Sequence, residues 1–179
     1  AVKCLKEEKN NRVTIAVLDV DHFKKVNDVY GHMYGDKILA RVGRKLKEVV
    51  GEDGVVGRIG GDEFIIVFNG INDEHALRGM LRAIRTQIKW EFVDDFEDLT
   101  ITCSIGASYS PNNGTEYEEL FKKADYCLYV AKEKGRDRYV FFRDELHRAE
   151  YEATLNGSEM KAFNSNREVR ELQYVSKFM

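Results

Sequence analysis

Residues 58–64 read Arg58-Ile59-Gly60-Gly61-Asp62-Glu63-Phe64 and lie between two short apolar runs, 55–59 and 64–68. Both runs are rich in β-branched residues. A Gly-Gly pair between such runs predicts a β-hairpin, because glycine adopts positive φ at no steric cost. The turn then presents two adjacent carboxylates, Asp62 and Glu63, at its tip. On their own, these acids are equally consistent with an ordinary solvated turn.

A second acidic strand end, Asp19-Val20-Asp21, lies upstream and changes that interpretation. Residues 13–18 form a near-continuous apolar run, which is typical of a central strand buried on both faces. The run ends directly in Asp19, so this carboxylate is expected at the tip of a rigid strand. Together, Asp19 and Asp62 predict a shared acidic site.

The composition is that of a soluble globular protein with one domain and a modest appendage. The chain has 179 residues, of which 43% are hydrophobic and 33% charged, with a net charge of −3. This charge argues against a general nucleic-acid binder, and we expect no nucleic acid polymer as partner. Three scattered cysteines suggest reduced thiols in the cytoplasm. No signal peptide or membrane span is visible, so we expect no membrane contact by this chain, although a region outside it could anchor the full-length protein.

The remaining pattern predicts helices and strands around the hairpin. Helical spacing covers residues 21–30, 36–50, about 73–88 and 115–134, and further strands are expected at 99–106 and 139–142. This order predicts an α+β fold with a mainly antiparallel central sheet covered by helices. We expect a domain over residues 1–142 and a helical tail over 143–179. The tail would pack on the domain, on a second copy or on a missing module, or remain solvated.

Several motifs also follow one another in a fixed order: Leu18-Asp19-Val20-Asp21-His22-Phe23-Lys24-Lys25-Val26-Asn27-Asp28, Gly31-His32, Gly35-Asp36, Arg58-Ile59-Gly60-Gly61-Asp62-Glu63-Phe64, Ala124-Asp125, Leu128-Tyr129, Ala131-Lys132 and Gly135-Arg136. Over roughly the first 142 residues the chain resembles a GGDEF domain, the diguanylate cyclase family. The resemblance implies a palm-like fold related to nucleotidyl cyclases and polymerases. It also implies a bacterial signalling reaction that condenses two GTP into cyclic di-GMP with release of pyrophosphate.

The acidic residues suit that reaction, because a 3′-hydroxyl must attack a phosphorus surrounded by negative oxygens. The resemblance implies Mg²⁺, with Mn²⁺ as an alternative, held by Asp19, Asp62 and the backbone carbonyl of Val20. Such a cation takes one or two protein carboxylates and completes its shell with phosphate and water. Asp62 occupies the position of the general base, and Glu63 is a further catalytic acid and ligand. Lys24 would stabilise the transition state.

The substrate-binding residues are likewise implied by the resemblance. Asn27 and Asp36 match the guanine-reading positions, and an aspartate accepts from the N1 and N2 hydrogens that adenine lacks. His32 would contact substrate or organise its loop, and the amides of Phe23 and Lys24 would meet phosphate oxygens. Lys132 and Arg136 match a triphosphate-binding pair, and we expect them on one face of the fourth helix.

Two departures from the family pattern affect regulation. The Arg-x-x-Asp product-inhibition site is replaced by residues 51–54, Gly-Glu-Asp-Gly, so we expect no feedback inhibition there. The usual Asp-x-Leu-Thr lead-in motif is missing, and we expect an N-terminal sensor or dimerisation module in the full-length protein. Each domain would hold one GTP, so catalysis requires a homodimer. The alternatives are a GTP-holding regulatory module without synthesis, and a cyclase of altered base choice.

Overall fold

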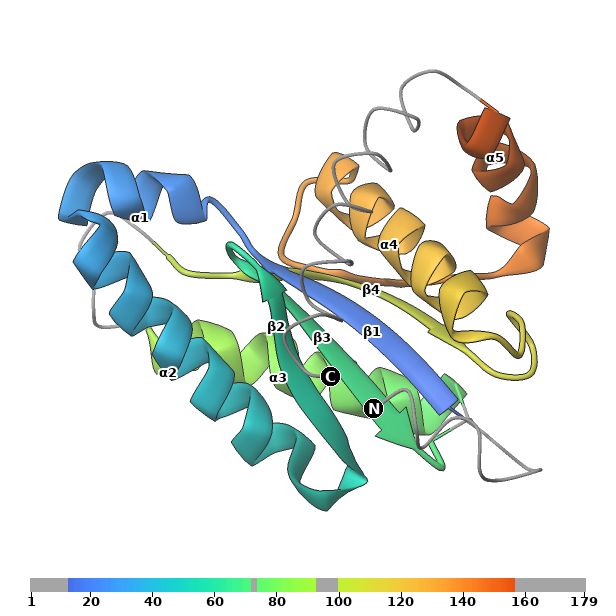
Figure 1. The fold of residues 1–179 in the computed structure, drawn as a ribbon, viewed down its shortest axis with the longest axis horizontal. Coiled ribbons are helices and arrows are strands. Elements are labelled where there is room, and N and C mark those ends of the chain that lie inside the picture. Colours follow the sequence, from blue (N-terminus) through green and yellow to red (C-terminus); the bar gives the residue numbers. More distant parts are fainter. Residues whose placement is uncertain (1–12, 72–73, 93–99, 157–179) are drawn as a thin grey trace.

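The computed structural model describes residues 13–71, 74–92 and 100–156. Its strands form one five-stranded sheet in the order β2-β3-β1-β4-β5 (Figure 1). The strands are β1 (Val13–Val20), β2 (Gly54–Gly60), β3 (Glu63–Asn69), β4 (Cys103–Tyr109) and β5 (Tyr139–Phe141). All neighbouring pairs are antiparallel except β4 and β5, which are parallel. The predicted α+β fold with a mainly antiparallel sheet is confirmed.

The central strand β1 is buried along its whole length, as its apolar run predicted. Successive side chains of a strand point to opposite faces, so β1 contributes to two separate cores. Ala16 and Leu18 belong to the core under α1, α2 and α3, whereas Ile15 and Val17 pack beneath α4. β1 is therefore held on both faces, and its tip is a rigid position.

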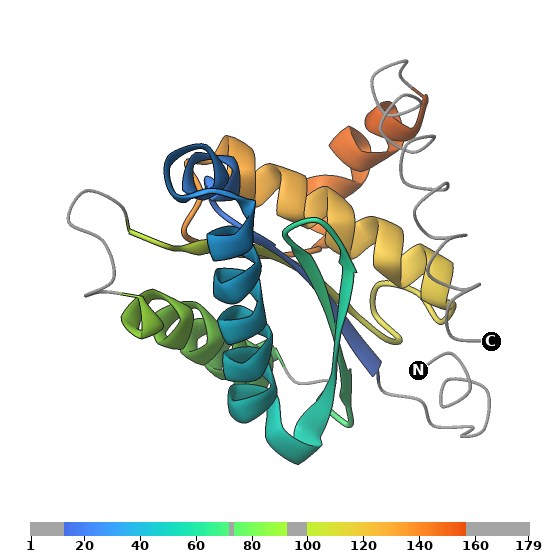
Figure 2. The same ribbon diagram turned by 60° about the vertical axis from the view of Figure 1, so that its left-hand side comes forward.

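The helices cover both faces of the sheet (Figures 1 and 2). α1 (Phe23–Tyr30), α2 (His32–Val50) and α3 (Glu74–Glu91) lie on one side, and α4 (Tyr117–Glu133) lies on the other. A short 3₁₀ turn, Gly51–Asp53, joins α2 to β2. In the part of the chain that the structure describes, no helix is long and apolar enough to cross a membrane.

The last described helix, α5 (Asp144–Asn156), packs outside α4 and forms a small core of its own. Tyr126 of α4 meets Phe142 and Tyr151 in this core, with ring centroids 6.2 and 5.4 Å from its own. Leu146, by contrast, is 65% exposed. Residues 157–179 of the predicted tail lie outside the described residues, and the division at residue 142 stays a prediction.

Some predicted boundaries were wrong for identifiable reasons. α2 begins at His32, four residues before the prediction, because its first turn contains a glycine and an exposed methionine, Met33, and so shows no inward apolar period. Tyr30, at the end of α1, is 44% exposed, with its ring 5.4 Å from that of Tyr34. β4 begins at Cys103 rather than 99, because its pairing with β1 runs from Cys103 to Tyr109.

Candidate active site

The two acidic stretches lie side by side at one end of the sheet. In the β1–β3 pairing, Asp19 stands opposite Glu63, and the backbone N–H of Val20 donates to the carbonyl of Asp62 at 3.2 Å. The hairpin turns through Gly61, whose φ is +45°. The guanidinium of Arg58 donates to the Gly61 carbonyl at 2.8 Å and closes the turn. The predicted shared acidic site therefore has a rigid frame.

Asp19 is the most perturbed of these acids. Its side chain is almost completely buried, and the ammonium of Lys132 lies 2.6 Å from Oδ2. Burial raises the pKa of Asp19 to about 6, Lys132 opposes that rise, and the charges of Asp62 and Glu63 add to it. Burial is the largest cause of this rise, so the pair with Lys132 does not fully replace the water that the Asp19 carboxylate has lost. Three carboxylates also gather here beside one lysine, which leaves an excess of negative charge.

This excess of negative charge fits a divalent cation. Among the described residues no three His, Cys, Asp or Glu side chains form a ready-made metal cluster. Mg²⁺ does not need one, because it commonly binds through one or two carboxylates and completes its shell with substrate phosphates and water. Asp19 with Asp62 or Glu63 could supply that donor set, and a bound cation would favour the charged form of Asp19, which burial disfavours.

A second feature of the site is an unpaired polar atom between α1 and α2. Oδ1 of Asn27 is buried and has no hydrogen-bond partner among the described residues. Buried acceptors without partners are rare in folded proteins. A Cβ atom on Gly35 would come 2.0 Å from this oxygen, so the absence of a side chain at Gly35 makes room for it. Asp36, the other predicted guanine-reading residue, directly follows Gly35 and is exposed.

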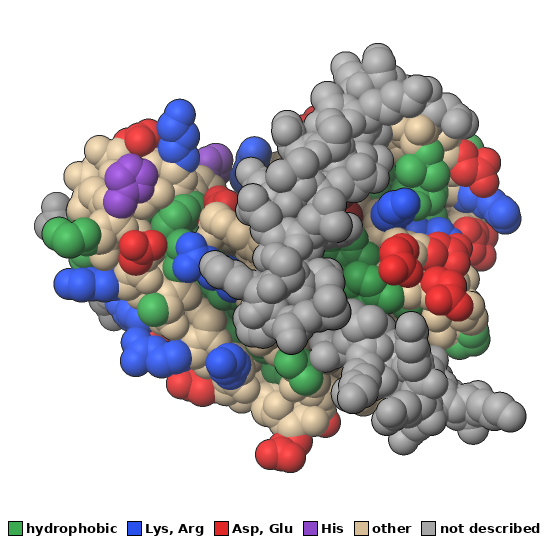
Figure 3. All heavy atoms as spheres, viewed as in Figure 1, with side chains coloured by type: hydrophobic (Ala, Val, Ile, Leu, Met, Phe, Trp, Pro, Cys, Tyr) green, Lys and Arg blue, Asp and Glu red, His purple; other side chains and the backbone are tan. Residues whose placement is uncertain are grey.

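The start of α1 faces the same region. His22, in a left-handed conformation with φ 56°, precedes the helix, and no side chain caps it. Phe23 is buried beneath the helix, Lys24 is exposed on its first turn, and His32 is the exposed first residue of α2. Basic side chains gather over α1 and α2 on the face drawn in Figure 3. This arrangement favours the approach of an anion.

The comparisons with known proteins agree with this geometry. A model of the family described as "Diguanylate cyclase, GGDEF domain" matches residues 1–138. The chain belongs to the GGDEF family. It is 35% identical over 143 residues to the cyclic di-GMP phosphodiesterase PdeR of Escherichia coli K12, which covers 80% of this chain and 22% of that protein. It is 37% identical over 136 residues to the diguanylate cyclase DosC of the same strain, covering 75% and 29%.

Solved structures of the family share the fold. The GGDEF domain of DgcB from Caulobacter crescentus, in complex with c-di-GMP, gives a TM-score of 0.67 at 28% identity, covering 78% of this chain and 83% of that one. The active GGEEF domain of a diguanylate cyclase from Vibrio cholerae gives 0.63 at 30%, covering 74% and 83%. Because the chain spans only about a fifth to a third of PdeR and DosC, their names leave its own activity open.

One prediction about this GGDEF domain was wrong, namely that Lys132 and Arg136 share a face of α4. The helix ends at Glu133, and Gly135 follows in a left-handed conformation with φ 99°. The Gly135 N–H donates to the carbonyl of Lys132 at 3.2 Å, and the Arg136 N–H donates to that of Ala131 at 3.1 Å. These bonds are those of a Schellman motif. Arg136 therefore extends from the loop after the helix, while Lys132 reaches Asp19 from its last turn.

A buried carboxylate at Asp21 was not predicted to have a role. It is 1% exposed and accepts hydrogen bonds from the hydroxyls of Thr102 and Ser104, both at 2.7 Å. It also accepts from the backbone N–H of Asp137 at 3.1 Å. Asp21 thus connects the tip of β1 to the start of β4 and to the loop that carries Arg136. Its place two residues after Asp19 was the only sequence signal.

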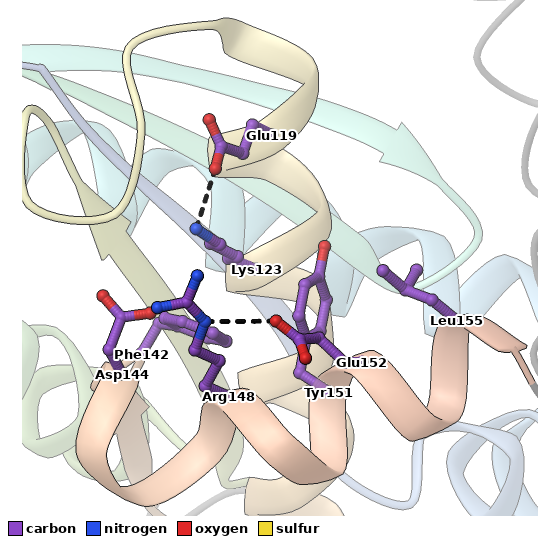
Figure 4. A pocket seen from close by; sticks show the side chains of 8 residues that line it. All are labelled: Glu119, Lys123, Phe142, Asp144, Arg148, Tyr151, Glu152 and Leu155. Atoms are coloured by element: carbon purple, nitrogen blue, oxygen red, sulfur yellow. Dashed lines mark hydrogen bonds and ion pairs between the residues drawn. The ribbon is translucent and has the colours of Figure 1, made fainter.

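A hollow of about 320 Å³ lies apart from this site, between α4 and α5 (Figure 4). It opens beside the first half of α4, whereas Lys132 lies on the last turn of that helix. Its charged side chains largely neutralise one another, with Lys123 paired to Glu119 and Arg148 to Glu152. This hollow is therefore a poorer candidate for a phosphate-bearing ligand than the hairpin site.

Proposed function

We propose that this domain is a Mg²⁺-dependent diguanylate cyclase, which condenses two GTP into cyclic di-GMP and two pyrophosphates. The observation that supports it most strongly is the excess negative charge at Asp19, Asp62 and Glu63, beside a lysine and at the ends of rigid strands. Acidic groups in this arrangement suit metal-assisted phosphoryl transfer. The unpaired oxygen of Asn27 supports a purine-binding site next to them.

Each residue then has a distinct task in the proposed reaction. Asn27 and Asp36 bind the edge of guanine, and Asp36 selects it against adenine because it accepts from N1–H and N2–H₂. His32 lies beside them on the first turn of α2. Together these residues fix the base, and with it the ribose, in one orientation.

The phosphates are bound by the residues around the strand ends. Lys132, Arg136 and the first amides of α1 at Phe23 and Lys24 hold the triphosphate, and the ammonium of Lys24 stabilises charge that develops on the transferred group. Asp62 accepts the proton of the attacking 3′-hydroxyl. A divalent cation held by Asp19, Glu63 or Asp62 and the Val20 carbonyl supplies neutralising charge for the pyrophosphate that leaves.

The proposed reaction needs two domains, since each binds one GTP. A homodimer brings them face to face, and a dimerising or sensor module before residue 1 would set their effective concentration. Feedback inhibition through residues 51–54 is not expected, because the 3₁₀ turn begins with Gly51 and β2 begins with Gly54, where the family's site has Arg and Asp. We place the reaction in the cytoplasm, which suits the buried free thiols of Cys103 and Cys127.

The second candidate is a regulatory module that binds GTP without converting it. Two of the relatives, PdeR of Escherichia coli and NbdA of Pseudomonas aeruginosa, are named cyclic di-GMP phosphodiesterases rather than cyclases. A GGDEF domain in such a protein would act through GTP binding alone. Both candidates use the same binding residues, so only turnover separates them.

The deciding experiment is incubation of the purified chain with GTP and Mg²⁺ at several protein concentrations, followed by chromatography of the nucleotides. A cyclase gives cyclic di-GMP at a rate steeper than first order in protein, and Asp62→Asn abolishes the product while GTP still binds. Supplying ATP beside GTP tests base choice. If wild-type protein fused to an N-terminal dimeriser binds GTP and leaves it intact, the regulatory module is the correct function.

A further inference from the structure

The loop after α4, residues 134–138, has an unusual backbone. Gly135, Arg136 and Asp137 all have positive φ, at 99°, 59° and 43°. Two of them are not glycine, and side chains disfavour this left-handed conformation. Such a run persists only where the surrounding structure determines it, and such backbone is often found at functional sites. The contacts that hold this loop in its conformation therefore indicate its role.

The contacts restrain Asp137 from two sides. On the sheet side, its backbone N–H donates to the buried carboxylate of Asp21 at 3.1 Å. On the helix side, Arg85 of α3 donates to the carbonyl of Asp137 at 2.8 Å and to its carboxylate at 2.9 Å. Lys89, one turn further along α3, reaches the other carboxylate oxygen at 3.3 Å. The loop is thus connected both to the tip of β1 and to α3.

The residues on either side of Asp137 are fixed as well. The carbonyl of Arg138 accepts from the Ile105 N–H of β4 at 2.9 Å, and the Arg136 N–H is bound to the end of α4. The backbone of Arg136 is therefore held before and after it, while no hydrogen bond or ion pair of its guanidinium is found within the described residues. A free cationic group on a fixed backbone is suited to receiving an anion.

We propose that Asp137 is a positioning residue for GTP binding, held between Asp21 and Arg85 so that Arg136 points toward the triphosphate. This inference rests on the proposed function and assigns a role to residues that touch no substrate. Removing the Asp137 carboxylate breaks its contacts with Arg85 and Lys89 and leaves those of the backbone, so Arg136 would lose part of its orientation and none of its charge. The expected effect is therefore confined to ligands that carry the β- and γ-phosphates.

The test compares the affinities for GTP and GMP, measured by calorimetry in Mg²⁺ on the full chain. Asp137→Ala should weaken GTP binding about tenfold and change GMP binding less than about twofold, because Asn27 and Asp36 lie on other elements. Asp137→Asn keeps one carbonyl acceptor and should recover part of the lost GTP affinity.

Two arginines of α3 provide a matched pair that removes the same charge. Arg85→Gln should reproduce the selective loss of GTP affinity, whereas Arg82→Gln, which alters an exposed residue about one turn away, should not. If Asp137→Ala fails to fold, as judged by circular dichroism, the GTP and GMP affinities of Arg85→Gln and Arg82→Gln provide the same test.

The possible outcomes distinguish a failure of the positioning role of Asp137 from a failure of the proposed function. Wild-type protein that does not bind GTP overturns both. If wild-type protein binds GTP and the Asp137 and Arg85 variants bind it equally well, the positioning role alone is wrong. Equal weakening of GTP and GMP binding also overturns it, since that pattern indicates general loss of structure.

Discussion

Asp19→Asn is expected to stabilise the metal-free protein at neutral pH. Burial, with the charges of Asp62 and Glu63, raises the pKa of Asp19 from 3.8 to about 6 in the folded state, despite the opposing charge of Lys132. The folded state therefore binds this proton more tightly than the unfolded chain does. The contribution of Asp19 to stability is therefore most favourable below about pH 3.8, falls as pH rises toward 6, and stays reduced above it. The gap between the two values corresponds to about 3 kcal/mol.

The assay is urea unfolding in EDTA over a pH series, for the wild type and Asp19→Asn. At about pH 7.5 the variant should be more stable by about 1–3 kcal/mol, the upper figure being the full linkage value. The difference should shrink as pH falls from 6 toward 4, because the wild-type carboxyl then becomes neutral as well. Asp28→Asn removes an exposed carboxylate from α1 and should change stability by less than about 0.5 kcal/mol.

The same unfolding measurement, repeated with Mg²⁺ in place of EDTA, tests the metal site. Mg²⁺ should stabilise the wild type and leave Asp19→Asn nearly unchanged, because binding to the folded state alone raises stability. An Asp19→Asn variant that is less stable than the wild type at about pH 7.5 would refute the reasoning. In that case the ion pair with Lys132 would stabilise the ionised Asp19 by more than burial and the neighbouring carboxylates destabilise it.

Three further changes test the site and the packing around it. Gly35→Ala places a Cβ 2.0 Å from Oδ1 of Asn27 and should weaken GTP binding at least tenfold by calorimetry, whereas Gly79→Ala, which meets no atom within 4 Å, should not. Gly106→Ala places a Cβ 2.0 Å from the carbonyl of Ala124 and should lower the free energy of unfolding by about 2–4 kcal/mol, measured in urea. Burial, followed by the charges of Lys134 and Arg143, lowers the pKa of His147 below 6.5 against the opposing charge of Glu150, and its Nδ1 accepts from the Arg143 N–H at 3.0 Å. The docking of α5 should therefore weaken as pH falls below about 6.5, seen as lower hydrogen-exchange protection of its amides, and His147→Phe should remove this pH dependence.

The core of the fold could be predicted because its signals are local. The apolar run of β1 predicted a strand buried on both faces, and the Gly-Gly turn predicted the hairpin that pairs with it. The ends of strands and helices were less predictable where contacts with other elements determine them. β4 starts where its pairing with β1 starts, and the first turn of α2 has no inward apolar spacing, because Met33 is exposed and Gly35 has no side chain.

The acidic part of the site was predictable for the same reason, since Asp19 and Asp62 each end or follow a recognisable strand. The network around Asp21 was not. Its partners Thr102 and Asp137 are 81 and 116 residues away in the chain, and no local pattern relates either of them to Asp21. The position of Arg136 was predicted wrongly, because residues four apart share a helix face only within the helix, and Arg136 lies beyond Gly135, which is in a left-handed conformation.

Asp19 and Asp21 show how solvation by neighbouring groups separates the roles of two similar residues. They lie two positions apart at the tip of β1, and both are almost fully buried. Asp21 accepts three hydrogen bonds from neutral donors, so its charge is satisfied within the protein. Asp19 faces two other carboxylates and has one lysine, and its raised pKa shows that its charge is not fully compensated. A carboxylate left in this state gains by binding a cation, whereas one that is already satisfied would lose hydrogen bonds. The same strand end therefore offers the proposed metal ligand, Asp19, beside a structural anchor, Asp21.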